Sequence, residues 1–148
     1  PVGRLDYDSE GLLLLTNDGE LTFALTHPSH RVPKTYLVWV DGIPSKEQLE
    51  QMARGLDLKD GRTAPAKVKL LGEHNGNAKV EVVLKEGRNR QIRRMFEHIG
   101  YRVLRLKRIK IGDLSLGAMR PGEYRNLTPS ELKQLQVQAG LKPASVKK

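Results

Sequence analysis

Residues 79–111 read KVEVVLKEGRNRQIRRMFEHIGYRVLRLKRIKI, and three patterns follow one another in this stretch. Apolar and charged residues alternate over residues 80–84, which is typical of a half-buried strand. From about Asn89 to Gly100 the apolar residues recur at helical spacing, which predicts a helix. Residues 103–111 predict a long second strand, with a bulge or bend near Lys107–Arg108 because the apolar phase changes there.

The rest of the chain supplies further strands and helices around this segment. Apolar runs, most of them bounded by Gly, Asp or Pro, predict strands at residues 12–16, 36–40 and 66–71. Ser45 with Gln48, and Thr128 with Glu131, form capping boxes, which predict helices ending at Gly55 and Gly140. We place Gly55 at a left-handed C-cap.

A short helix is also expected from Asp18 toward Thr26. Strands outnumber helices and do not alternate regularly with them, so the predicted fold class is α+β, with a mixed sheet and flanking helices. The length of 148 residues fits one domain over residues 1–140, followed by a flexible tail at residues 141–148.

Composition excludes several classes of protein. A hydrophobic content of 38% is too high for a disordered chain, and no apolar run approaches the length of a membrane span. The chain contains no Cys, which excludes disulfide scaffolds and thiolate chemistry and permits a reducing compartment. We therefore expect a cytoplasmic protein.

The net charge of +9 indicates a polyanionic partner, of which nucleic acid is the commonest. A generically basic soluble protein is the alternative. The four His residues do not form a metal-binding pattern, and neither of the common Gly-rich phosphate-binding motifs occurs. We expect no metal and no nucleotide cofactor.

Residues 85–96, KEGRNRQIRRMF, run from a turn with several Arg into a helix. Arg90, Arg93 and Arg94 lie largely opposite the apolar face of that helix, and Arg93 lies nearest to Phe96. There the stem of Arg93 can be buried while its guanidinium is held for a specific carboxylate. Cations in a first turn oppose the helix dipole, so this pattern favours phosphate binding over a merely solvated basic face.

Residues 3–19, GRLDYDSEGLLLLTNDG, place three acids within five residues between an Arg and an apolar run. Such a turn presents carboxylates. It is also compatible with an Asx-type turn that leads into a strand, in which Asp and Ser satisfy local backbone donors.

Together these segments resemble a known family. GRLDYDSEGLLLLTNDG, the run Lys34–Leu37, EGRNRQIRRMFEHIG, and the residues from 104–111 to PGEYRNLT at 121–128 are similar in content and order to ribosomal RNA pseudouridine synthases of the small-subunit branch. Within that branch the similarity is greatest to the large-subunit synthases of the B type. It spans residues 2 to about 136 and implies a pseudouridine synthase catalytic fold with a largely antiparallel sheet.

The resemblance implies a role for several residues. Asp6, and neither Asp8 nor Asp18, corresponds to the catalytic Asp, which acts as a nucleophile at C1′ or assists glycosidic cleavage with proton removal at C2′. Tyr36 corresponds to the ring that stacks on the target uracil, and Arg93 to the partner of the catalytic carboxylate. The expected substrate-binding residues are Tyr36, Arg93, Arg4 and Ile92, and the residues expected to contact RNA phosphates are Arg88, Arg90, Arg94, Lys107 and Arg108.

The resemblance also implies a flipped uridine in a ribosomal RNA stem-loop, no cofactor and, in our reading, a monomer. A large-subunit RNA is the expected substrate, with small-subunit RNA as the alternative. The family carries an N-terminal RNA-binding domain and an opening strand before the GRLD motif, so we expect this chain to be most of a catalytic domain. A non-catalytic RNA-binding module is the rival from another class, and a hydrolase is disfavoured because no Ser-His-Asp or metal-ligand pattern is visible.

Overall fold

The computed structural model describes residues 5, 8–16, 19–26, 32–88, 90–117, 119–120 and 123–141. Within these residues the predicted α+β class is confirmed. Six strands form one mixed sheet, in which five follow the order β1-β7-β2-β6-β5. The sixth, β8, pairs with Lys110 and Ile111 at the end of β7. Only the pairing of β1 with β7 is parallel among the described strands, so the sheet is largely antiparallel.

The elements follow one another as strands and helices of unequal length. The strands are β1 (Glu10–Gly11), β2 (Lys34–Asp41), β3 (Asp57–Leu58), β4 (Gly61–Arg62), β5 (Lys67–His74), β6 (Asn77–Leu84), β7 (Arg102–Ile111) and β8 (Leu114–Ser115). The helices are α1 (Gly19–Thr26), α2 (Lys46–Arg54), α3 (Gln91–His98) and α4 (Pro129–Gln138). The short strands β3 and β4 form a separate hairpin.

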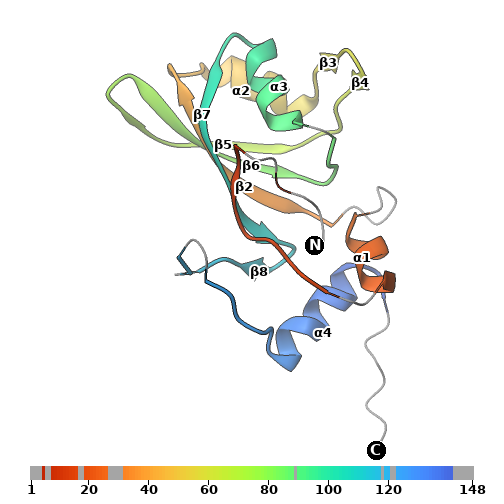
Figure 1. Cartoon of the computed structure of the whole chain (residues 1–148). Coiled ribbons are helices and arrows are strands. Elements are labelled where there is room, and N and C mark those ends of the chain that lie inside the picture. The colour runs from red at the N-terminus through yellow and green to blue at the C-terminus, as the bar shows by residue number, and fades with distance from the viewer. Residues whose placement is uncertain are drawn as a thin grey trace, which may run out of the picture.

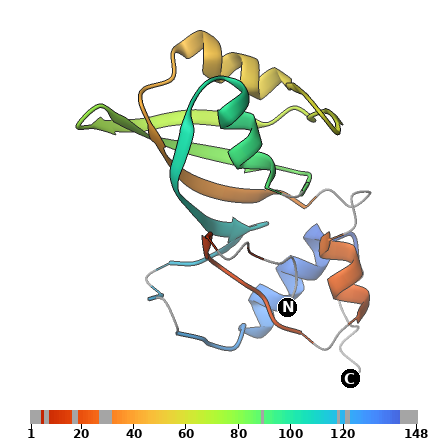
Figure 2. The ribbon, with the colours of Figure 1, turned by 45° about the horizontal axis from the view of Figure 1, so that its top comes forward.

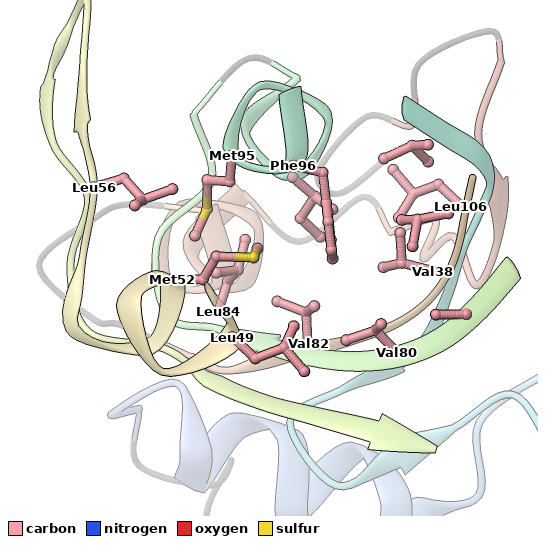
Figure 3. Close-up of a cluster of buried hydrophobic side chains, with 14 residues drawn as sticks. Val38, Leu49, Met52, Leu56, Val80, Val82, Leu84, Met95, Phe96 and Leu106 are labelled. Atoms are coloured by element: carbon pink, nitrogen blue, oxygen red, sulfur yellow. The ribbon is translucent and has the colours of Figure 1, made fainter. Parts of the chain in front are cut away.

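Two apolar clusters hold these elements together. Helices α2 and α3 lie on one face of the sheet, whereas α1 and α4 lie side by side near the far end of β7 (Figures 1 and 2). Figure 3 shows Met52 of α2 and Met95 and Phe96 of α3 converging on the valines and leucines of the sheet. The second cluster joins α1 and α4 to Val32, Ile111 and Leu114.

Local sequence signals explain where the helices begin. The Ser45 hydroxyl accepts a hydrogen bond from the Gln48 amide, and the Gln48 side chain accepts one from the Ser45 amide, so the predicted capping box is confirmed. Thr128 and Glu131 repeat this arrangement at α4. Gly55 has the positive φ of 115° that Gly tolerates, but its ψ of 149° differs from that of the left-handed helical conformation expected at the C-cap.

The bulge predicted in β7 near Lys107–Arg108 is present, and it lies one residue later, at Ile109. Thr35 pairs with Lys110 and Tyr36 with Arg108, so Ile109 is the extra residue, and a second irregularity leaves out Leu104. These shifts keep Val103, Leu106, Arg108 and Ile111 buried even though their spacing in the sequence is uneven.

The strand predicted at residues 12–16 is wrong. Strand β1 consists of Glu10 and Gly11. Beyond it the Leu12 amide donates to the Arg108 carbonyl at 2.8 Å, and Leu14 forms a single β-bridge. Leu12 and Leu14 are buried while Leu13 and Leu15 are exposed, so the alternation is that of an extended chain without a continuous partner. Leu13 and Leu15 instead border a cavity of about 290 Å³ that is shared with residues 123–127.

Candidate active site at the start of helix α3

The Arg-rich turn enters α3 through a left-handed residue. Arg90 occupies the N-cap with φ 50° and ψ 33°, and its side chain makes no capping hydrogen bond. Gln91 compensates in part, because its side-chain oxygen accepts from the Arg88 amide at 3.2 Å. This conformation directs the basic side chains of the turn away from the helix core, where Ile92, Met95 and Phe96 are buried.

Two of these arginines hold one acidic residue. The guanidinium of Arg90 donates to both carboxylate oxygens of Asp8, at 3.0 and 2.9 Å. Arg93 donates from Nη2 to the backbone carbonyl of Asp8 at 2.8 Å, and its Nε lies 3.6 Å from Asp8 Oδ2. The residue that follows Asp6 by two positions is therefore fixed to α3 through both its main chain and its side chain.

The charges in this arrangement favour an ionised Asp8. The hydrogen bonds from Arg90, together with the positive charge of Arg93, hold the pKa of the Asp8 carboxyl below its usual value, although partial burial opposes them. The carboxylate also lies beside the start of α3, where the helix dipole favours an anion. The acidic turn and the basic turn thus stabilise each other.

Arg93 is the most enclosed of the three arginines on α3. Its side chain is 11% exposed, against 40% for Arg90 and 31% for Arg94. Its Nε is buried and makes no hydrogen bond with the part of the chain that the structure describes. This confirms that the Arg93 stem is buried, and it leaves one donor of a fixed guanidinium directed at the acidic turn.

Arg94 and Arg88 bind the β3–β4 hairpin. Arg94 donates to both carboxylate oxygens of Asp60 at 2.8 and 3.1 Å, and these bonds lower the pKa of Asp60. Arg88 donates to the carbonyls of Gly61 and Arg62 at 3.1 and 2.5 Å, and its Nε lies 2.8 Å from a Glu86 oxygen. Both arginines are thus already engaged by protein groups at the edge of the site.

Arg108 differs from the expectation of a phosphate contact. It is 4% exposed, and its Nε donates to the carbonyl of Leu12 at 2.9 Å. A buried guanidinium that binds the main chain is a structural support for the segment after β1. Lys34 lies nearby, and its burial together with the positive charge of Arg108 lowers the pKa of the Lys34 amine.

Tyr36 lies next to Arg108 in the sheet register and packs against the main apolar cluster. Since Val38 and Val40 on the same strand belong to that cluster, the Tyr36 side chain lies on the sheet face that carries α3. The structure therefore places Tyr36 and Arg93 on the same side of the sheet. Ile92 is 4% exposed within the apolar core, where it supports the helix, and its expected contact with substrate stays a prediction.

Lys107 lies on the opposite face, because it pairs with Leu37 and not with a core residue. Asp6 and Arg4 lie outside the described residues, so their predicted positions are not described. Within the described ranges no group of three or more His, Cys, Asp or Glu could hold a metal ion. No helix among them is long and apolar enough to cross a membrane.

Sequence reasoning missed the residues that orient the arginines. The resemblance assigns the catalytic role to Asp6 and not to Asp8, and no sequence signal shows that Asp8 attaches the acidic turn to α3. Asp60 stands in an Asp-Gly pair, a hairpin signal that would have predicted the β3–β4 turn. No local pattern shows that Asp60 meets Arg94, which lies 34 residues away in the chain.

Comparison with known proteins agrees with this geometry. Residues 1–98 match the model of the RNA pseudouridylate synthase family, a stretch that includes the acidic turn, Tyr36 and the start of α3. This chain belongs to the RNA pseudouridylate synthase family. Ribosomal large subunit pseudouridine synthase B of Bacillus subtilis is 50% identical over 141 residues, covering 94% of this chain and 58% of that protein.

A second curated relative and a solved structure are similar to this chain as well. Ribosomal large subunit pseudouridine synthase E of Vibrio parahaemolyticus is 45% identical over 140 residues, covering 85% of this chain and 59% of that protein. A crystal structure of a pseudouridylate synthase superposes with a TM-score of 0.85 at 39% identity, over 90% of this chain and 58% of that one. The chain thus spans about three fifths of the length of these family members.

Proposed function

We propose that this chain is the catalytic portion of a ribosomal RNA pseudouridine synthase. The observation that carries the proposal is the attachment of the acidic turn to α3: Asp8 is bound by Arg90 and Arg93, and Asp6 stands two residues before it. A family match that includes both segments supports the assignment of Asp6 as the catalytic carboxylate.

In the proposed reaction the bond between uracil N1 and ribose C1′ breaks, the base turns over, and a bond forms between C5 and C1′. Substrate and product are isomers, so the reaction needs no oxidant or reductant. The uridine must first leave its stack, at a cost of a few kcal/mol that RNA contacts offset. Asp6 acts either at C1′ or through the proton at C2′.

The enclosed guanidinium of Arg93 has a direct use in this mechanism. A carboxylate in a closed site is pushed toward its neutral form by desolvation, and a nearby guanidinium opposes that change. Because Arg93 already binds the main chain of Asp8, two residues further along the chain, we assign Arg93 as the partner of the Asp6 carboxylate. Tyr36, on the same side of the sheet, is the ring on which the flipped uracil stacks, and stacking of this kind is worth about 1–3 kcal/mol per base.

We propose large-subunit ribosomal RNA as the substrate, in keeping with the names of the relatives, and a stem-loop as the element recognised. Small-subunit RNA remains the alternative. The proposed protein acts as a cytoplasmic monomer without a cofactor, and Arg4 lies near the flipped nucleotide. Arg88 and Arg94 contribute to phosphate binding once RNA displaces their protein partners, whereas Arg90 contributes while it keeps its pair with Asp8.

The test replaces the carboxylate of Asp6 in the full-length protein. Asp6→Asn is expected to abolish pseudouridine formation in ribosomal RNA, mapped in cells that lack the natural gene, while purified protein keeps its fold and RNA affinity. The control is Asp57→Asn, which removes an exposed carboxylate paired only with Arg62 among the described contacts. An Asp6→Asn enzyme that retained a substantial rate would overturn the assignment, and intact RNA binding without any activity in wild type would favour the non-catalytic module.

A further inference from the structure

The face of the sheet that points away from α2 and α3 carries its own basic surface. Along β2 the even-numbered residues from Tyr36 to Val40 pack toward the helices, so Leu37 and Trp39 point the other way. On β6 the same alternation buries Val80 and Val82 and leaves the odd-numbered residues outward.

The register of the strands shows which side chains share this face. Trp39 lies between Lys79 of β6 and Arg105 of β7, and Leu37 lies between Glu81 and Lys107. On β5, Lys69 pairs with Glu81, and Lys67 pairs with the outward Val83. We call the set Trp39, Lys67, Lys69, Lys79, Arg105 and Lys107 the outer basic face.

The cations of this face form two rows with an apolar strip between them. Arg105 and Lys107 lie on β7, whereas Lys67, Lys69 and Lys79 lie on β5 and β6, and β2 separates the two groups. With neighbouring strands about 4.8 Å apart, residues on β7 and β5 are separated by roughly 14 Å. Three carboxylates, those of Glu81, Glu10 and Asp41, offset part of this charge, and Glu10 is paired with Arg105.

Trp39 is held in the centre of the strip by two cations. The Arg105 guanidinium lies 4.5 Å from the centre of the indole ring, and the Lys79 amine lies 5.5 Å from it. These cation–π contacts fix the positions of long side chains that would otherwise be mobile. The positive charges are therefore presented in a defined arrangement before any partner binds.

This face is separate from the candidate active site. Arg93 extends from α3, which packs on the opposite face, and Asp8 is bound there. Lys67 and Lys69 are exposed on β5, where they pair with the outward residues Val83 and Glu81. An anion on the outer basic face would thus not occupy the position of a flipped uridine.

We propose that the outer basic face binds the phosphate backbone of double-stranded RNA next to the modified nucleotide or in a neighbouring helix. A-form RNA has a wide, shallow minor groove between two phosphate strands, and it is recognised by shape and backbone contacts. Two basic rows on either side of a low apolar strip complement that shape. The proposal rests on the proposed function only in taking RNA as the partner.

The decisive variant is Lys67→Gln/Lys69→Gln, which removes two charges without placing like charges beside Glu81. The matched control is Arg54→Gln/Lys133→Gln, which removes two exposed charges from α2 and α4. Binding of the full-length protein is measured against salt for two RNAs: a short hairpin that holds the target uridine, and the same hairpin with an extended duplex stem.

The outer-face variant is expected to reduce the slope of log Kd against log salt by about two for the extended RNA, as the loss of two phosphate contacts requires. For the short hairpin the slope and the rate of pseudouridine formation should stay those of the wild type, as they should for the control with both RNAs. A second readout is the fluorescence of Trp39, the single Trp of this chain, which should change with the extended RNA and not with the short one.

The two proposals fail in different ways. Equal slopes for the outer-face variant and the control, or an unchanged Trp39 signal with the extended RNA, would overturn the second RNA surface while leaving catalysis intact. Loss of activity in wild type with normal slopes would instead contradict the proposed function alone. A larger effect on the short hairpin than on the extended one would also contradict the outer face, because it would assign these lysines to the uridine site.

Discussion

The carboxylate of Asp8 and the guanidinium of Arg90 form a two-point hydrogen-bonded pair, at 3.0 and 2.9 Å, between segments separated by 82 residues. Such a pair fixes orientation as well as distance, since two parallel bonds resist rotation. The acidic turn at Asp8 is therefore attached directly to the start of α3. Catalysis by Asp6 should accordingly depend on Asp8, which holds the turn at α3 and has no proposed contact with RNA.

Asp8→Asn tests this dependence. The amide keeps the size of the side chain but replaces one acceptor oxygen with a donor, so the two-point pair with Arg90 is lost. We expect a fall in the single-turnover rate of roughly 10- to 100-fold, since misplacement by about 1 Å can cost that much, with little change in RNA affinity. Asp57→Asn is the control for loss of an exposed ion pair, and an unchanged Asp8→Asn rate would show that the turn is positioned by other contacts.

Arg90 and Arg93 should differ in degree and not in kind. Both bind Asp8, so Arg90→Gln and Arg93→Gln are both expected to slow the reaction at saturating RNA. The larger loss is expected for Arg93, because it is the more enclosed and would leave a partly buried turn without its cation. Arg93→Lys should also retain less activity than Arg90→Lys, since an ammonium group cannot reproduce the paired hydrogen bonds of a guanidinium. Equal losses, and equal activity of the two Lys variants, would contradict this ranking.

Much of the scaffold could be predicted from local signals. The alternation in residues 80–84 and the capping boxes at Ser45 and Thr128 were sufficient because period and caps are properties of adjacent residues. Leu12–Leu15 misled the prediction, since the alternation of an extended chain is the same whether or not a neighbouring strand pairs with it. The Arg108 position was also missed, because burial of a guanidinium depends on a carbonyl 96 residues away.

In the candidate site, too, local motifs predict the residues but not the contacts between distant segments. The motifs identified Arg93 and the acidic turn, but the attachment of Asp8 to Arg90 and of Asp60 to Arg94 arises only when distant segments fold together. A sequence displays which charges exist. Which of them are already paired in the folded protein depends on tertiary structure, and this decides which arginines meet RNA without first releasing a carboxylate.

Acid should weaken the N-terminal cap of α4 through Glu131. Hydrogen bonds from Arg125 and the Thr128 amide lower the pKa of Glu131 from 4.5 to about 2. A carboxyl whose folded pKa is depressed stabilises the fold above its unfolded pKa and loses that contribution as the pH falls. Wild type should therefore lose more stability than Glu131→Gln between about pH 4.5 and pH 2, with thermal unfolding as the measurement. Parallel pH profiles would contradict the ion pair, and Glu50→Gln on α2 is the control.

Gly11 is the position at which the segment after the acidic turn comes closest to the sheet. Its φ is +119°, and a Cβ there would lie 2.2 Å from the Arg108 carbonyl oxygen and 2.5 Å from the Arg108 amide nitrogen. Both atoms belong to the main chain of β7, which is paired with β2 on its other side, so neither can move freely away from Gly11. Gly11→Ala should therefore displace β1, together with the bond from the Leu12 amide to Arg108.

The expected result is a loss of more than about 1 kcal/mol in the free energy of unfolding, accompanied by a lower rate of pseudouridine formation. Gly19→Ala provides the comparison, because a Cβ at the start of α1 would meet no atom within 4 Å. That change should leave the rate unaltered and stabilise the protein by about 0.4–1 kcal/mol, since it removes freedom only from the unfolded chain. If denaturant unfolding gave equal values for the two variants, the close approach of Gly11 to Arg108 would not be what holds the acidic turn at α3.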